Sequence, residues 1–193
     1  MKGLAQQFNY LSLPHGLVLA VGIRLGIGYG SDRLTDESGF TIPIAERFFA
    51  GGATTLRGFA LDQASPLRDV VAFDNGAPII EDGRPLIVKG DPVGGNILSL
   101  VNLELRFPIW GNLRGVAFSD NGAVYPLLSD FTFRDWRYNA GFGFRYDTPL
   151  GPLRVDYGIN LDRRTFKSIH CPDQRVACTE PLGRWHVSLG HAF

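Results

Sequence analysis

The feature that most constrains this chain is a strict alternation of apolar with small or charged residues through residues 17–29. The mainly apolar set is Leu17, Leu19, Val21, Ile23, Leu25, Ile27 and Tyr29, and the alternating set is Val18, Ala20, Gly22, Arg24, Gly26 and Gly28. A period of two describes a β-strand with one apolar face. The run is too long for an ordinary strand and suits one that crosses a bilayer at a tilt, which needs about nine to eleven residues. It therefore predicts a transmembrane strand.

The same alternation returns along the chain and predicts further strands. The seven strands expected are residues 3–13, 17–29, 97–109, 113–125, 138–146, 153–161 and 185–193, of which the first and fourth alternate less cleanly. The faces expected to meet lipid carry Leu19, Val21, Ile23, Phe142, Phe144, Val155, Tyr157, Val187 and Leu189. Arg or Lys on those faces should be more costly than the same change at Gly143 or Ser188, which alternate to the other side.

The connections between these strands are short and long in turn. The short ones are residues 13–16, 108–112 and 148–151, and the long ones are residues 30–95, 123–137 and 162–184. Outer-membrane barrels join their strands in this way, with short periplasmic turns and long extracellular loops. The predicted fold class is therefore all-β, a transmembrane antiparallel β-barrel. Bacterial barrels use an even number of strands, so we expect upstream strands to close the sheet, with oligomeric closure or a fusion as alternatives.

Composition and charge exclude several other classes. No apolar run reaches the roughly 18 residues that a membrane-spanning helix needs. The formal net charge is zero and the basic residues are scattered, so no nucleic-acid surface is expected. The His and Cys residues never take metal-ligand spacing, and no Ser, His and Asp set has a nucleophile turn, so we expect no metal, no cofactor and no enzymatic activity. The alternative is a soluble ligand-binding β protein, which would not partition into detergent as a membrane barrel does.

Two local features concern export. Cys171 and Cys178 lie in the last long connection, and their spacing favours a small disulfide loop in an oxidising compartment, with two unrelated thiols as the alternative. Met1-Lys2-Gly3 is followed by no apolar signal-peptide core. Because an outer-membrane protein must be exported before it folds, we expect the sequence to begin inside a longer protein.

A long string in the first external connection resembles a family signature. Residues 46–59 read Glu-Arg-Phe-Phe-Ala-Gly-Gly-Ala-Thr-Thr-Leu-Arg-Gly-Phe, similar to the sixth-loop pattern R-F-x-x-G-G-x-x-x-(V/L)-R-G-(F/Y) of the BamA/TamA superfamily. The matching positions are Arg47, Phe48, Gly51, Gly52, Leu56, Arg57, Gly58 and Phe59. Residues 118–122 resemble the family's (F/G)-x-D-x-G strand motif through Phe118, Asp120 and Gly122. Residues 103–108 and 148–153 also match, and the terminal strand, which ends at Phe193, resembles the family's assembly signal.

The resemblance implies a sixteen-stranded barrel in which residues 1–193 form strands ten to sixteen of one domain. The first nine strands and any POTRA domains, which in this family receive client polypeptides, would lie upstream. The implied partners are outer-membrane lipid, unfolded or partly folded client proteins, and periplasmic or lipoprotein accessory subunits. The implied function is insertion, assembly or translocation of other proteins at the bacterial outer membrane. A two-partner-type secretion pore and a passive barrel anchor for an upstream domain are alternatives.

The resemblance makes Arg57 the leading site residue, with a structural and gating role. In the family this arginine lies on a loop folded into the barrel lumen, where its permanent charge needs acceptors around a planar fork. Alternation places Glu104 on the polar face of its strand, and the resemblance places Asp120 on the inner wall of the next. Both carboxylates are therefore expected to converge on Arg57. An ordinary solvated loop arginine is the alternative.

The remaining signature residues have expected supporting roles. Gly51, Gly52 and Gly58 would allow the tight backbone of a loop tip, and Leu56 and Phe59 would pack beside it. Gly190 weakens the terminal strand because glycine packs no side chain. In the family a glycine there lets the last strand bend and open a lateral seam. The alternative is a glycine that merely fits the barrel wall.

Overall fold

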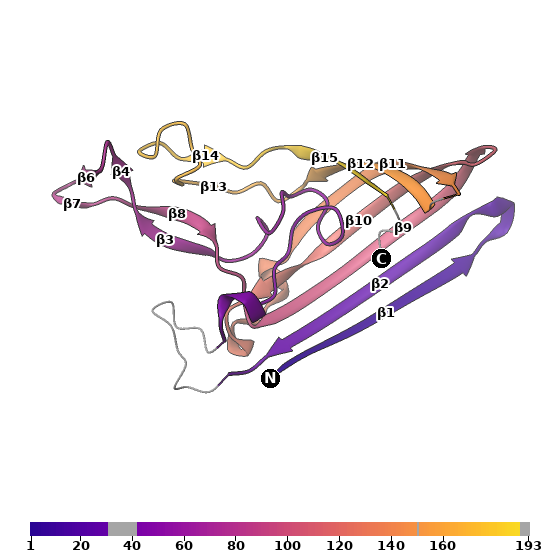
Figure 1. Cartoon of the computed structure of the whole chain (residues 1–193), viewed down its shortest axis with the longest axis horizontal. Coiled ribbons are helices and arrows are strands. Elements are labelled where there is room, and N and C mark those ends of the chain that lie inside the picture. Colours follow the sequence, from indigo (N-terminus) through magenta and orange to yellow (C-terminus); the bar gives the residue numbers. More distant parts are fainter. Residues whose placement is uncertain (31–41, 150, 190–193) are drawn as a thin grey trace.

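Seven long antiparallel strands form the main sheet of the protein (Figure 1). The computed structural model describes residues 1–30, 42–149 and 151–189. The strands are β1 (Lys2–Ser12), β2 (Val18–Gly28), β9 (Ile97–Trp110), β10 (Leu113–Tyr125), β11 (Arg137–Thr148), β12 (Gly151–Asn160) and β15 (Gly183–Leu189). Each pairs with the next in sequence order, so that β1 and β15 are the edge strands of the described sheet. The seven predicted strands are confirmed.

Two strands show where the alternation pattern is an incomplete guide. Strand β15 begins earlier than expected, because Gly183 and Arg184 already pair with β12. The end predicted for that strand, with Gly190 and Phe193, lies outside the described residues. Strand β10 reads irregularly because polar residues sit on its outward side, where Asn121 Nδ2 donates to Ser119 Oγ at 3.0 Å.

The two faces of the sheet have opposite chemistry. One face exposes bulky apolar side chains, including the predicted Ile23, Phe142, Phe144, Val187 and Leu189. The other predicted lipid-facing residues are half-buried, namely Leu19, Val21, Val155 and Tyr157. The opposite face buries charged groups, because Glu104 and Asp120 are 0% exposed. This distribution is the reverse of a soluble domain and fits a sheet with lipid on its apolar side.

One expectation about the inner face is wrong. Gly143 alternates to the polar side, and Arg or Lys there is expected to cost less than on the lipid-facing side. A Cβ added at Gly143 would overlap the Oδ1 atom of Asp156. The position therefore has no room for a side chain while Asp156 keeps its place, although Gly143 does lie on the polar side as predicted.

In the described part of the chain, no helix is long and apolar enough to cross a membrane.

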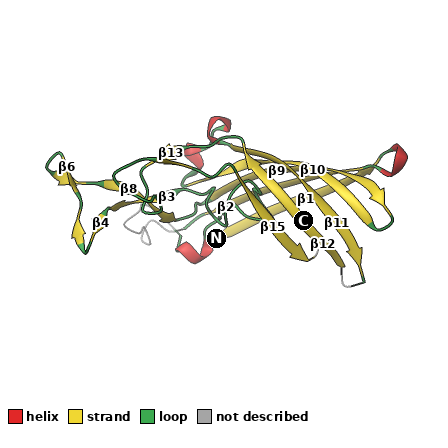
Figure 2. Ribbon diagram, turned by 90° about the horizontal axis from the view of Figure 1, so that it is seen from above, coloured by secondary structure: helices red, strands yellow, loops and turns green. Residues whose placement is uncertain are grey.

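The segment between β2 and β9 is the longest excursion from the sheet. It contains the short 3-10 helix η3 (Ile44–Glu46), then a loop over residues 47–66 that lies against the inner face, then a projecting β-arm. The arm comprises β3 (Leu67–Val71), β4 (Phe73–Asp74), β5 (Ala77–Pro78), β6 (Ile80–Glu81), β7 (Arg84–Pro85) and β8 (Ile87–Pro92). Figures 1 and 2 show it extending beyond one end of the sheet. Its own small core contains Ala72, Ile79, Leu86 and Val88.

The other long connections emerge at the same end as the arm. Between β10 and β11 lie the 3-10 helices η4 (Leu128–Asp130) and η5 (Phe133–Asp135). Between β12 and β15 lies the disulfide loop, residues 161–182, with the short strands β13 (Thr165–Phe166) and β14 (Cys178–Thr179). At the opposite end of the sheet, the 3-10 turn η1 (Pro14–Gly16) joins β1 to β2. The predicted segregation of long and short connections is therefore present.

The disulfide loop is bonded to the arm. Cys171 and Cys178 form the predicted disulfide, with their Cα atoms 5.8 Å apart. Beside it, Lys89 N donates to Lys167 O at 2.9 Å and Ile169 N donates to Lys89 O at 3.0 Å. The crosslinked loop thus supports one side of the arm at its β8 strand.

Candidate functional site

Arg57 forms the centre of a buried ion cluster on the inner face. Its Nε and Nη2 atoms each lie 2.8 Å from an oxygen of Asp120, and its Nη1 lies 2.9 Å from Glu104 Oε2. The Arg57 side chain is 2% exposed and both carboxylates are fully buried. The structure therefore brings together the three residues that the sequence suggested would converge. The Asp120 contact is two-pronged, which uses the planar fork that only arginine offers.

A third carboxylate, Asp156 of β12, completes the cluster. Arg57 Nη1 lies 3.5 Å from Asp156 Oδ2, and the same oxygen accepts from Arg145 Nη2 at 3.1 Å and Arg154 Nη2 at 2.9 Å. Asp156 is not among the partners expected for Arg57 from the sequence. Its alternation in residues 153–161 already gave the inward direction, which is the signal that could have identified it.

Further arginines surround the same carboxylates. Glu104 accepts from Arg106 Nε at 2.7 Å, and Arg145 Nη2 lies 3.5 Å from its other oxygen. Three carboxylates thus face four guanidinium groups, those of Arg57, Arg106, Arg145 and Arg154. When all its hydrogen bonds and ion pairs are formed, such a network favours a single arrangement of the loop and strands. Removing one partner leaves a buried charge unpaired, which is destabilising.

Burial and pairing act in opposite directions on Arg57. Burial alone would lower the pKa of Arg57, but the hydrogen bond and charge of Asp120, with the charges of Glu104 and Asp156, raise that pKa above its usual value. The guanidinium is therefore charged at any accessible pH. The Phe118 ring lies 3.4 Å from the guanidinium carbon, so this residue of the strand motif covers one face of the charged plane.

The wall also holds the backbone of the loop tip. Four carbonyl groups of residues 53–57 each contact a side chain from a different strand. The pairs are Ala53 O with Arg154 Nη2 at 3.3 Å, Thr54 O with Arg24 Nη1 at 2.7 Å, Thr55 O with Asn102 Nδ2 at 2.8 Å, and Arg57 O with His186 Nε2 at 2.9 Å. Strands β12, β2, β9 and β15 therefore all anchor the loop.

Glycines allow the loop and wall to approach closely. A Cβ on Gly158 of β12 would overlap the carbonyl of Arg57, and one on Gly58 would lie 2.6 Å from Asn139 Cβ. Gly51 and Gly52 have φ angles of 120° and 96°, which favour glycine, so the tight turn expected there is present. In β10, a Cβ on Gly122 would overlap Ser99 O. Each of these positions needs its glycine for a steric reason.

The other signature residues hold the base of the loop. Arg47 is buried and donates to Ile42 O at 3.0 Å and Val93 O at 3.1 Å, so it contributes to the loop base rather than to the central ion cluster. Phe48, Leu56 and Phe59 belong to one apolar cluster of the loop and wall, whose other members are Ala50, Ala64, Leu98, Leu100 and Val124. The signature thus divides into a charged tip and an apolar base.

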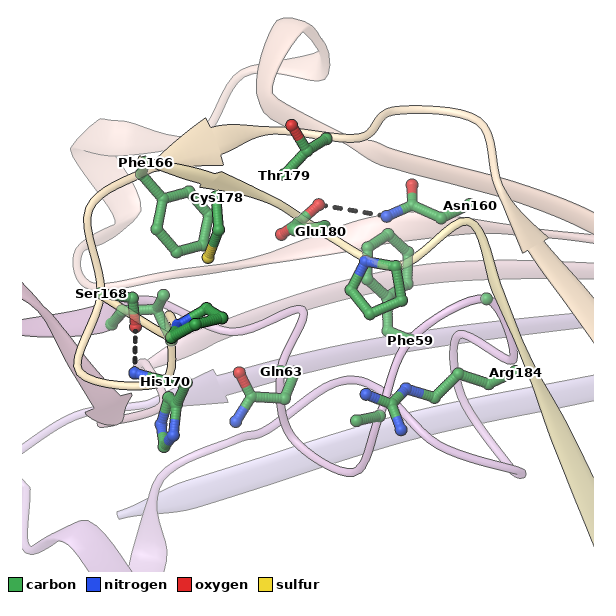
Figure 3. Close-up of a pocket in the computed structure, with 15 residues that line it drawn as sticks. Phe59, Gln63, Asn160, Phe166, Ser168, His170, Cys178, Thr179, Glu180 and Arg184 are labelled. Atoms are coloured by element: carbon green, nitrogen blue, oxygen red, sulfur yellow. Dashed lines mark hydrogen bonds between the residues drawn. The ribbon is translucent and has the colours of Figure 1, made fainter. Parts of the chain in front are cut away.

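A cavity of about 490 Å³ lies beside this site (Figure 3). Phe59 and Gln63 line it from the loop, Phe166 and His170 from the disulfide loop, and Arg184 from β15. Within its wall, Asn160 Nδ2 donates to Glu180 Oε2 at 3.1 Å. The cavity is therefore lined by three segments that lie far apart in the sequence, and one of them is the start of β15.

Comparison with known proteins connects this geometry to a family. The Omp85 superfamily domain matches residues 2–193. Outer membrane protein assembly factor BamA of Nitratidesulfovibrio vulgaris is 29% identical over 158 residues, which are 79% of this chain and 16% of that protein. Outer envelope protein 80, chloroplastic, of Arabidopsis thaliana is 28% identical over 125 residues, which are 60% of this chain and 13% of that protein.

A solved structure shows the same fold. The crystal structure of BamA from Haemophilus ducreyi lacking POTRA domains 1-3 superposes with a TM-score of 0.60 at 24% identity, covering 97% of this chain and 34% of that one. The chain spans less than a fifth of the length of the curated relatives. The match therefore concerns one portion of larger proteins.

Proposed function

Because this chain belongs to the Omp85 superfamily, we propose that it forms the last strands of a barrel that inserts, assembles or translocates other proteins. The chain is a BamA-like outer-membrane protein. In the proposed assembly it supplies strands ten to sixteen of a sixteen-stranded barrel, within one domain. Upstream strands complete the wall, and any POTRA domains and accessory subunits act from the periplasm.

The observation that carries this proposal is the anchoring of Arg57 to three strands of the main sheet. Its carboxylate partners come from β9, β10 and β12, so one side chain fixes the position of the loop relative to these strands. The proposed role is mechanical, and we assign no catalytic residue or cofactor. A fixed loop keeps this part of the wall rigid, so that any movement is concentrated at the sheet edge.

Strand β15 is the edge at which a client would meet the wall. Within this chain it pairs with β12, and in the proposed closed barrel its other side meets the first upstream strand. When that seam opens, β15 presents unpaired N–H and C=O groups that can pair with an incoming strand. The proposed clients are therefore unfolded or partly folded polypeptides that form β-strands, and the outward apolar residues of β15 face lipid during the exchange.

The test uses the intact protein reconstituted in lipid vesicles with an unfolded outer-membrane protein as client. Folding of the client is measured by gel electrophoresis of unheated samples, in which the folded barrel resists unfolding by detergent and migrates differently from the unfolded chain. We expect the wild type to accelerate client folding and Arg57→Ala to lose most of that acceleration, while Arg134→Ala, at an exposed loop position, retains it. A wild-type protein that leaves client folding unchanged would contradict the insertase form of the proposal.

The two alternatives predict different results in the same vesicles. A secretion pore would conduct ions and admit a partner polypeptide without folding it into the bilayer. A passive anchor would do neither, and Arg57→Ala would then lower only the stability of the barrel.

A further inference from the structure

The terminal strand has one side-chain connection to the loop tip. On β15, Trp185, Val187 and Leu189 point outward and are highly exposed, whereas His186 alternates to the inner face and is half-buried. His186 Nε2 lies 2.9 Å from the carbonyl oxygen of Arg57. Because a carbonyl oxygen only accepts, the Nε2–H group of His186 must be the donor. No other side-chain hydrogen bond from β15 occurs among the described residues.

The acceptor of this bond is held rigidly. The Arg57 side chain is fixed by Asp120 and Glu104, and its backbone N–H donates to Asp120 Oδ2 at 3.2 Å. Gly158 of β12 packs against the same carbonyl so closely that no Cβ would fit between them. The carbonyl of Arg57 is therefore held in a fixed position. A strand that donates a hydrogen bond to it is restrained by the whole ion cluster.

Within this chain, the backbone partner of β15 is β12. It pairs with β12 from Leu153↔Leu189 to Ile159↔Gly183, and β12 is its single neighbour in the described sheet. In the proposed barrel, the other side of β15 faces the first upstream strand. When that seam opens, one row of β15 backbone groups loses its partners, and the internal hydrogen bond of His186 then becomes a larger share of what retains the strand.

We propose that His186 is a positioning residue that ties the terminal strand to the Arg57 loop, so that this bond must break before β15 leaves the inner wall. This inference rests on the proposed function, in which β15 is the strand that clients meet. The loop therefore controls the edge through one carbonyl group. Loosening the Arg57 cluster should loosen β15 even though, in the described residues, the Arg57 side chain forms no hydrogen bond with β15.

The experiment measures amide hydrogen exchange in the intact protein in lipid nanodiscs, without any client. His186→Leu replaces the imidazole by an apolar side chain of similar size and so removes the donor. We expect β15 amides to exchange roughly three- to tenfold faster than in the wild type, as for loss of one hydrogen bond, with β9 and β10 unchanged. His186→Gln, which keeps an N–H donor, should restore most of the protection. Ser188→Ala, on the same inner side of β15, is the matched control and should change nothing.

Two outcomes would overturn the tie. One is unchanged β15 exchange in His186→Leu; the other is equal loss of protection in the Leu and Gln variants, which would mean that ring packing rather than donation matters. If the Leu variant fails to fold, ¹⁵N NMR of the wild type decides the question: the Nε2–H proton of His186 should be protected from solvent exchange, and rapid exchange would refute the bond. The exchange experiment contains no client, so it tests the His186 hydrogen bond separately from the proposed function. If β15 shows the expected protection but the protein does not accelerate client folding, only the proposed function is rejected.

Discussion

Arg57 and Asp120 form a two-pronged ion pair across 63 residues of sequence, with both N···O distances at 2.8 Å. The arginine lies in a loop and the aspartate in the centre of β10, so the pair attaches an excursion of the chain to its wall. Both groups are buried, and neither can lose its partner without leaving a charge in a poorly solvated place.

The first prediction is that Arg57 and Asp120 act as one unit. Arg57→Ala and Asp120→Ala should each destabilise the barrel, by about 3 to 5 kcal/mol if the site is dry and less if water enters. The double variant should be little worse than either single one, because the shared contact is already lost. Arg57→Lys should recover only part, since an ammonium cannot make the two-pronged contact. Unfolding in urea with lipid vesicles measures these values, and additive losses would show that the two residues act separately.

The second prediction concerns Asp156. Asp156→Asn removes a charge that faces Arg57, Arg145 and Arg154, and it should cost a few kcal/mol, about 2 to 4. The matched control is Asp147→Asn, whose exposed pair with Arg114 has an N···O distance of 3.3 Å and should matter by less than about 1 kcal/mol. Equal effects of the two changes in the urea assay would argue against a special role for the buried cluster.

The third prediction tests which face meets lipid. Phe142→Arg and Val187→Arg place a cation on the apolar side and should cost about 2 to 4 kcal/mol near the bilayer midplane. Ser188→Arg, on the inner side, should cost less. Gly143 is excluded as a control because Asp156 occupies its side-chain space. Photoactivatable lipids provide a second readout: labelling of Phe142 and Ser188 positions to the same extent would contradict the assignment.

The fourth prediction uses the contact between Gly158 and the loop tip. Gly158→Ala should push the Arg57 carbonyl away, since the new Cβ would overlap it, and should increase protease cleavage within residues 53–57. Gly3→Ala is the control, because its Cβ would meet Ile27 at an ordinary 3.8 Å. If both variants resist protease as the wild type does, the loop has room to adjust and the contact is not restrictive.

The fifth prediction concerns the disulfide. Peptide mapping without reduction should recover Cys171 and Cys178 in one crosslinked fragment, and free thiols in the exported protein would refute the pairing. Replacing both by Ser should cost the disulfide loop about 2 to 3 kcal/mol of local stability. Because the loop bonds to Lys89 of the arm, exchange should rise in β8 as well, while the seven-stranded sheet should be unaffected.

The sequence predicted the parts of this structure that depend on local periodicity. Alternation located the seven strands and the inward side of Glu104, and the family resemblance supplied Asp120. Alternation also gave the inward direction of Asp156, but not its contact with Arg57, because that contact depends on the stagger between strands as well as on the direction of the side chain. His186 was missed for another reason: its partner is a backbone carbonyl, which every residue possesses. The arm was read as loop because several of its strands have only two residues, too few to show a period.

The carbonyl contacts of the loop tip have a consequence for how the sequence can drift. Side chains of the wall bind the main chain at Ala53 and Thr54, so exchanging the side chains of these two residues leaves the bound carbonyl groups in place. Thr55 differs, because its hydroxyl also accepts from Gly51 N and donates to Gly51 O, each at 2.9 Å. We therefore expect substitutions to be tolerated better at residues 53 and 54 than at the donors Arg24 and Arg154. The family signature has three unspecified positions between its second glycine and the residue before its arginine, and here they are residues 53–55. At the first two of these positions the loop tip is held through its carbonyl groups by side chains of β12 and β2, so its position there does not depend on the residue type at the tip.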